Sequence, residues 1–133
     1  GGLSNNANWL LDGPNGREFA GCCISANLRD YGRLGLFALA NAKTPSNGAF
    51  TDNWMQQSTA PSEGYAGYGY FWWLLGDGIY AAEGVFGQFI VIDANRDLIV
   101  VLQSAWPEAY SEELEANALA FIQALSDYVV EGH

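Results

Sequence analysis

Residues 86–103, which read FGQFIVIDANRDLIVVLQ, decide the fold. Two apolar runs, at 89–92 and 98–102, flank a short polar segment at 94–97. Runs rich in β-branched residues on both sides of a turn segment are typical of a β-hairpin. We therefore predict antiparallel strands over 86–93 and 98–103. Neither run alternates apolar with polar residues, so both faces of the hairpin should be covered by helices.

A stretch rich in aromatic residues precedes the hairpin and predicts another strand. Residues 64–75 read GYAGYGYFWWLL. Aromatic side chains favour the pleated surface of a sheet, so we expect a strand near 68–75, with a turn at 76–78. The aromatic side chains either pack under a covering helix, which is their more common use, or form a stacking platform for flat ligands. The residues in question are Tyr68, Tyr70, Trp72 and Trp73.

A long helix is predicted near the end of the chain. Ser111 is a suitable N-cap, and acidic residues follow it in the first turn, where the helix dipole favours them. Apolar residues then recur at helical spacing, which predicts a helix over 111–130 with one apolar face. That face consists of Leu114, Ala118, Phe121, Ile122, Leu125, Tyr128 and Val129.

The first half of the chain contains one further periodic element. Apolar residues at helical spacing predict a helix over 26–42, with Ser25 as its N-cap. Its end is expected at the tract 43–48, because a proline in this tract disfavours helical geometry in the residue before it. A single helical turn is expected near 51–57, and residues 1–24 are expected to be loop with at most one short extended piece.

Length and charge limit the classes of function. The chain has 133 residues, which suits one domain, and its net charge is −10. An acidic surface repels phosphate backbones, so no nucleic-acid partner is predicted, and no apolar stretch is long enough for a membrane span. The only histidine is His133. A self-contained Ser-His-Asp triad and a histidine-rich metal site are therefore excluded, and no cofactor is predicted.

Several single residues have plain structural interpretations. A disulfide between the adjacent Cys22 and Cys23 would be strained and rare, so we expect both as buried small apolar residues. Asp30 is expected on a solvated helix face or in a local ion pair. Residues 93–97 resemble the opening of a calcium loop, but the glycine and the bidentate glutamate of such a loop are absent, so a hairpin turn is expected. Because Met55 is the only methionine, the chain is expected to be a fragment or a processed product.

Three stretches, in their order and spacing, resemble a known family. They are GCCISANLRDY at 21–31, YGYFWW at 68–73 and GVFGQ at 84–88. With the hairpin and helix that follow, they are similar to the C-terminal part of the penicillin-recognising, β-lactamase-related serine hydrolases. The nearest branch is that of the 6-aminohexanoate-dimer hydrolases and class C-like esterases, and the resemblance covers most of 18–130.

This resemblance implies both a fold and an activity. The fold would be α/β of the α+β type, the C-terminal portion of a β-lactamase/transpeptidase-like fold in which helices cover an antiparallel sheet. The whole protein would hydrolyse a small-molecule ester or amide through an acyl-enzyme. The rival readings are a non-catalytic binding module that uses the aromatic run and a catalytically dead homologue kept for partner contacts. The resemblance implies a periplasmic or secreted protein, with a cytoplasmic one as the alternative.

Two catalytic motifs of that family are missing from the chain. The Ser-x-x-Lys motif supplies the nucleophile and its base. Here Lys43 is the only lysine, and Ala40 stands three residues before it. No tyrosine is followed two places on by asparagine, so the Tyr-x-Asn motif is absent too. The resemblance implies that both lie on an N-terminal part of the same protein, which would be the partner of this chain and cover its apolar surface.

The third family motif, a Lys-Thr-Gly or His-x-Gly strand, has a candidate match here. If Gly84 is its glycine, Ala82 and Glu83 take the first two positions, and the Val85 N–H is one of the two oxyanion donors. A glycine there lets the strand approach a substrate closely. The alternative is an ordinary strand glycine or a bulge.

Two side chains complete the predicted substrate site. The Glu83 carboxylate would repel a substrate carboxylate, which argues against β-lactams and favours a neutral or amine-bearing ester or amide. The alternative is that Glu83 faces solvent. Tyr70, from the aromatic run, joins Glu83 and Gly84 as a predicted substrate-binding residue, while Val85 is the predicted catalytic donor.

Overall fold

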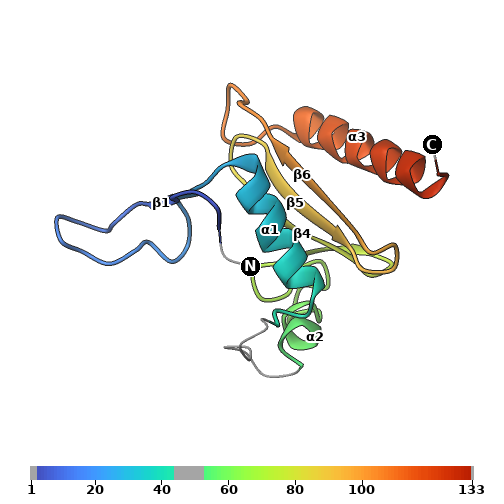
Figure 1. The fold of residues 1–133 in the computed structure, drawn as a ribbon, viewed down its shortest axis with the longest axis horizontal. Coiled ribbons are helices and arrows are strands. Elements are labelled where there is room, and N and C mark those ends of the chain that lie inside the picture. The colour runs from blue at the N-terminus through green and yellow to red at the C-terminus, as the bar shows by residue number, and fades with distance from the viewer. Residues whose placement is uncertain (1–2, 44–52, 133) are drawn as a thin grey trace.

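The computed structural model describes residues 3–43 and 53–132 (Figure 1). Its elements are β1 (Asn8–Trp9), β2 (Ile24–Ser25), α1 (Leu28–Leu39), α2 (Trp54–Ser58), β3 (Trp73–Gly76), β4 (Ile79–Gly84), β5 (Gln88–Asp93), β6 (Leu98–Gln103) and α3 (Glu112–Val130). Strands β3, β4, β5 and β6 form one antiparallel sheet in chain order, and β1 pairs with β2 separately. The architecture is α+β with an antiparallel sheet, as predicted.

The central hairpin agrees closely with the prediction. β6 has the predicted bounds, and β5 pairs with it from Gln88↔Gln103 to Asp93↔Leu98. β5 begins two residues later than predicted because Phe86 and Gly87 have φ values of 64° and 83° and form the turn from β4. The turn at 94–97 is also confirmed, and the Asp93 carboxylate accepts from N–H groups in it rather than opening a calcium loop.

The prediction of a strand over 68–75 is wrong in its first half. The strand β3 begins only at Trp73, and the Gly69 N–H donates to the Trp72 carbonyl at 2.8 Å, which folds the intervening residues into a tight loop. Phe71 lies in the left-handed region, with a φ of 64°. The periodicity also missed β4, whose alanines and glutamate have weak strand preference but which pairs along its full length with β5.

Helices cover both faces of the sheet, as the unbroken apolar runs predicted (Figure 1). On one face Gly35 lets α1 lie close to β5, since a Cβ there would be 3.1 Å from the Ile90 side chain. On the other face Ala118 and Ile122 of α3 pack in one cluster with Val91. Successive β5 residues therefore alternate between the two cores, and Ile92, which is fully buried, belongs to the α1 side.

The ends of α1 differ from the prediction. Its N-cap is Asn27, whose side-chain oxygen accepts from the Asp30 N–H at 2.9 Å, whereas Ser25 lies in β2. The helix ends at Leu39 because Asn41 and the residue after it have positive φ. The predicted terminating tract falls mainly on 44–48, outside the described residues. The helical turn expected near 51–57 corresponds to α2, although 51 and 52 also lie outside the described residues.

Helix α3 confirms the predicted bounds and cap, but its apolar face is covered only in part. The Ser111 hydroxyl accepts from the Leu114 N–H at 3.4 Å. Of the predicted face, only Ala118 and Ile122 are buried, because one strip of the helix meets the sheet. Four large apolar residues of the helix are 36–55% exposed. They are Phe121, Leu125, Tyr128 and Val129.

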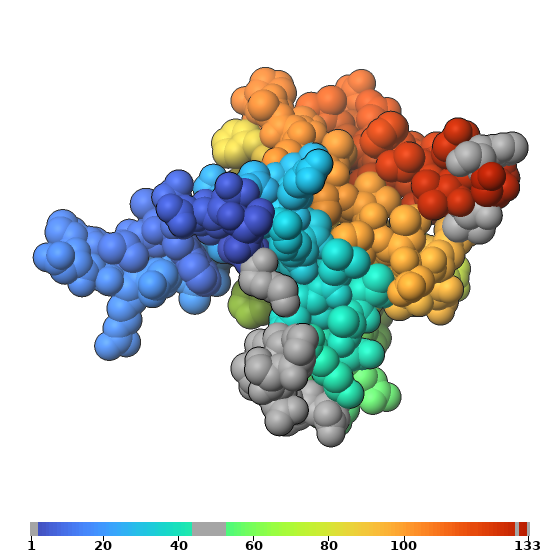
Figure 2. All heavy atoms as spheres, in the orientation of Figure 1, coloured from blue at the N-terminus to red at the C-terminus, as the bar shows by residue number. Residues whose placement is uncertain are grey.

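The segment before α1 is mostly loop and extends away from the sheet as an arm (Figure 2). It contains two short extended pieces, β1 and β2, rather than at most one. Cys22 and Cys23 lie in this arm, are exposed and form a disulfide with each other. The expectation of two buried free cysteines is wrong, because the arm has no core in which to bury them.

Asp30 is buried in a clamp rather than on a solvated face. It is 1% exposed and accepts hydrogen bonds from the Ser4 N–H at 2.8 Å and from Asn27 Nδ2 at 2.9 Å. It also forms the local ion pair that was predicted, with Arg33 rather than with its neighbour Arg29. The hydrogen bond from the Ser4 N–H, together with Arg33, outweighs burial and lowers the pKa of Asp30 to about 2. The carboxylate therefore fixes the start of the described chain to α1.

Among helices of the described residues, none has the length and apolar character that a membrane span requires.

Candidate functional site

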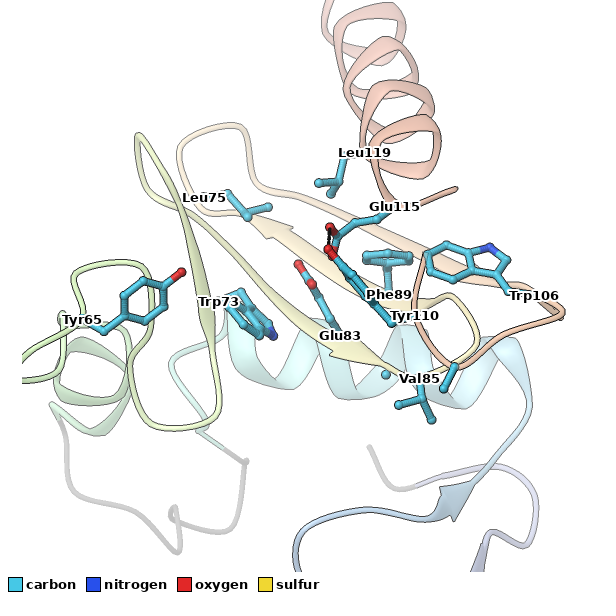
Figure 3. Close-up of a pocket in the computed structure, with 12 residues that line it drawn as sticks. Tyr65, Trp73, Leu75, Glu83, Val85, Phe89, Trp106, Tyr110, Glu115 and Leu119 are labelled. Carbon is cyan, nitrogen blue, oxygen red and sulfur yellow. Dashed lines mark hydrogen bonds between the residues drawn. The ribbon is translucent and has the colours of Figure 1, made fainter. Parts of the chain in front are cut away.

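A pocket of about 650 Å³ lies where the end of β4 faces the start of α3 (Figure 3). Strands β3 and β4, the loop that leads into α3 and the first turns of α3 contribute its walls. Its lining residues are Tyr65, Trp73, Leu75, Glu83, Gly84, Val85, Phe89, Trp106, Ala109, Tyr110, Glu115 and Leu119. The volume is that of a site for a small molecule.

The pleat of β4 directs Glu83 into this pocket. Ala81 is fully buried in the core beneath α3, and Glu83, two residues further along the strand, lies on the same face. Glu83 is partly buried, and in Figure 3 its carboxylate points into the space between Trp73 and Tyr110. The interpretation that Glu83 simply faces solvent does not describe this arrangement.

A second carboxylate comes from α3. Glu115 lies in the first turn of the helix and accepts a hydrogen bond from the Tyr110 hydroxyl at 3.1 Å. Burial, together with the negative charge of Glu115, raises the pKa of Glu83 from its ordinary value of 4.5 to about 7. The hydrogen bond to Glu115 also raises the pKa of Tyr110. The pocket therefore carries negative charge, and no lysine or arginine is among its lining residues.

The turn after β4 is held in place by the segment before α3. Gly84 pairs with Gln88 as the last residue of β4, and Val85, which is 62% exposed, follows it. The Phe86 N–H donates to the Ala109 carbonyl at 2.9 Å, and the Phe86 carbonyl accepts from the Trp106 N–H at 3.2 Å. The backbone beside Val85 is thus fixed from both sides at the mouth of the pocket.

The structure brings together three of the four predicted site residues. Glu83, Gly84 and Val85 all line the pocket, but Tyr70 does not. Its exposed ring lies 6.1 Å from the ring of Trp54 on α2. Within the aromatic run, Trp72 packs against Tyr80 with ring centroids 5.1 Å apart, which is the packing role that was expected to be more common.

Sequence reasoning missed Glu115, Tyr110 and Trp106. Glu115 has a sufficient local explanation as an acidic residue in the first turn of a helix. Its proximity to Glu83 depends on how α3 crosses the end of β4, and no spacing in the sequence indicates that crossing. No protein-family model matches the chain, and no curated protein matches it either.

Glu83→Gln is expected to stabilise the protein in a pH-dependent way. The raised pKa means that the folded state binds the proton of Glu83 more tightly than the unfolded state, so this contribution is complete below pH 4.5 and is lost between pH 4.5 and about 7. Because glutamine cannot ionise, the variant should exceed the wild type by about 1 to 2 kcal/mol above that window, after allowance for solvent screening of a half-buried group.

Urea unfolding above and below this pH window measures the difference. Glu113→Gln is the matched control, because Glu113 is exposed, lies on the same helix as Glu115 and does not line the pocket. An equal gain for Glu83→Gln at both pH values would contradict the assignment of the effect to ionisation.

Proposed function

We propose that this chain is the C-terminal part of a β-lactamase-related serine hydrolase, and that the end of β4 forms one wall of its active site. The observation that carries the proposal is the position of Glu83, Gly84 and Val85. Glu83 and Gly84 end an interior strand of the sheet, and Val85 follows them at the mouth of a pocket of ligand size. Gly84 takes the place of the motif glycine, although Ala82 stands where the family motif has lysine or histidine. The α+β architecture, with helices on both faces of an antiparallel sheet, agrees with this proposal.

In the proposed reaction, a serine hydroxyl from the N-terminal part attacks the carbonyl carbon of an ester or amide. The new bond to the serine oxygen forms as its proton passes to the lysine of the same motif, and the carbonyl oxygen becomes an oxyanion. The Val85 N–H donates to that oxyanion. The leaving alcohol or amine then takes the proton, and water hydrolyses the acyl-enzyme by the same steps in turn.

A backbone donor suits this role because it needs no particular side chain. The hydrogen bonds of Phe86 to Ala109 and Trp106 hold the adjacent peptide, so little reorganisation accompanies the reaction. One such preorganised donor contributes about 3 kcal/mol to transition-state stabilisation.

The uncovered surface of the chain supports an N-terminal partner from the same protein. The exposed apolar residues of α3 form a strip that soluble domains normally cover. β6 is the last strand of the sheet and has no charged residue, although edge strands are usually protected by charges. Both features favour a chain whose sheet and helix continue into another segment.

Val85→Pro tests the proposal directly. Proline removes the N–H, so kcat of the complete protein for an activated ester should fall by about 10² to 10³, whereas Val85→Ala keeps the N–H and should retain activity. Thermal unfolding of both variants shows whether the fold is retained. Equal kcat values for the two variants, both folded, would contradict the proposed donor.

A non-catalytic binding module is the second candidate, and the aromatic lining of the pocket favours it. The sequence that precedes this chain in the whole protein discriminates between the two. A Ser-x-x-Lys motif there favours the enzyme, and its absence favours the binding module.

A further inference from the structure

Among the residues that the structure describes, the pocket beside β4 is lined by two carboxylates and by no lysine or arginine. Glu83 and Glu115 both line it, and burial and mutual repulsion, with no hydrogen bond, account for the raised pKa of Glu83. Arg33 of α1 pairs with Asp30, and Arg96 of the 94–97 turn pairs with Asp93, so neither is directed to the pocket. A positive charge that enters the pocket would therefore relieve a repulsion that the described residues leave uncompensated.

Aromatic rings form much of the remaining wall. Trp73 meets Tyr65 edge to face with ring centroids 6.5 Å apart, and Phe89 lies 6.0 Å from Trp106 on the other side. Figure 3 shows Glu83 between these two groups of rings. The faces of tryptophan and tyrosine rings attract an ammonium group that lies within about 6 Å of the ring centre.

We propose that this pocket binds a primary alkylammonium group, with Glu83 and Glu115 as its hydrogen-bond acceptors and the rings around its alkyl chain. The binding of an ammonium group does not depend on the hydrolase function. Only the assignment of that group to the enzyme's substrate rests on the proposed function. The alternative of an inorganic cation fits less well. Calcium and magnesium take six or more oxygen ligands, whereas apolar and aromatic side chains line most of this pocket.

The two carboxylates also predict how binding depends on pH. Since the pKa of Glu83 is about 7, a large fraction of the Glu83 carboxyl groups is protonated in neutral solution. An ammonium ion favours the charged carboxylate, so binding should release a proton and strengthen as pH rises through 7. A neutral ligand of the same shape should show no such rise.

Calorimetric titration of the whole protein with butylammonium, 1-butanol and butyrate tests the site. Butylammonium should bind about tenfold more tightly than 1-butanol above pH 7, and butyrate should not bind. Glu83→Gln and Glu115→Gln should each weaken butylammonium binding about tenfold, while Glu113→Gln, on the exposed side of the helix, leaves it unchanged. Glu83→Gln is expected to be more stable than the wild type, so loss of folding does not explain its loss of binding.

Equal binding of butylammonium and 1-butanol would overturn the proposal, and so would an equal loss in the Glu113→Gln control. The hydrolase proposal fails separately. If butylammonium binds as expected but Val85→Pro leaves ester turnover unchanged, the cation site stands without the proposed reaction. If Val85→Pro abolishes turnover and butylammonium does not bind, the cation site alone is wrong.

Discussion

Gly87→Ala is expected to destabilise the chain by about 4 kcal/mol, the sum of backbone strain and overpacking. Gly87 is buried in the turn between β4 and β5 and has a φ of 83°, a region that side chains rarely adopt. A Cβ at this position would overlap the indole ring of Trp106. That ring cannot retreat freely because it packs against Phe89 in the core.

Gly64→Ala is the matched control for this loss. Gly64 has a φ of 87°, but a Cβ there would meet nothing within 4 Å. Its substitution should therefore cost only the strain of a left-handed alanine, about 1 to 2 kcal/mol. Urea unfolding of both variants gives the two values. Equal losses would show that Trp106 does not press against the turn and that the wall of the pocket is looser than described.

The parts of the fold that the sequence predicts correctly are those with a strong local signal. β6 is a continuous apolar run after a polar turn, and α3 begins at a serine followed by acidic residues. Both kinds of signal depend on neighbours in the chain. The error at 68–72 has the opposite cause, because Gly69 lies against the Ser58 carbonyl and the loop is shaped by that distant contact rather than by aromatic preference.

The same distinction applies to single residues and to the site. In the sequence, Asp30 resembles any exposed acidic residue of a helix. Its burial depends on Ser4, which is 26 residues away in the chain. Glu83 was predicted from a motif. The position of Glu115 beside it depends on how α3 crosses the end of β4. A motif indicates where a strand ends. It does not indicate which helix places a charge beside that strand and so changes the pKa of a side chain such as Glu83.

The 133-residue chain on its own is expected to hydrolyse an activated ester no faster than buffer. Lys43 has no serine three residues before it, so the chain lacks Ser-x-x-Lys, and His133 is its only histidine. Under the proposed function the chain supplies an oxyanion donor and a binding pocket but no nucleophile, so the covalent step cannot take place. Relative to the complete protein the loss should reach at least about 10⁶-fold, the lower range of enzymatic acceleration.

A chromogenic ester assay of the purified chain, beside the complete protein, measures this difference. Association of several copies cannot restore activity, because every copy lacks the same motif. Addition of a separately produced N-terminal part that carries Ser-x-x-Lys should restore turnover if it binds the exposed strip of α3 and the outer edge of β6, which pairs with no other strand in the described part of the chain. Turnover by the chain alone, well above background and constant through further purification, would show that it contains a nucleophile of another kind. The proposed division of the active site between two parts of the protein would then be wrong.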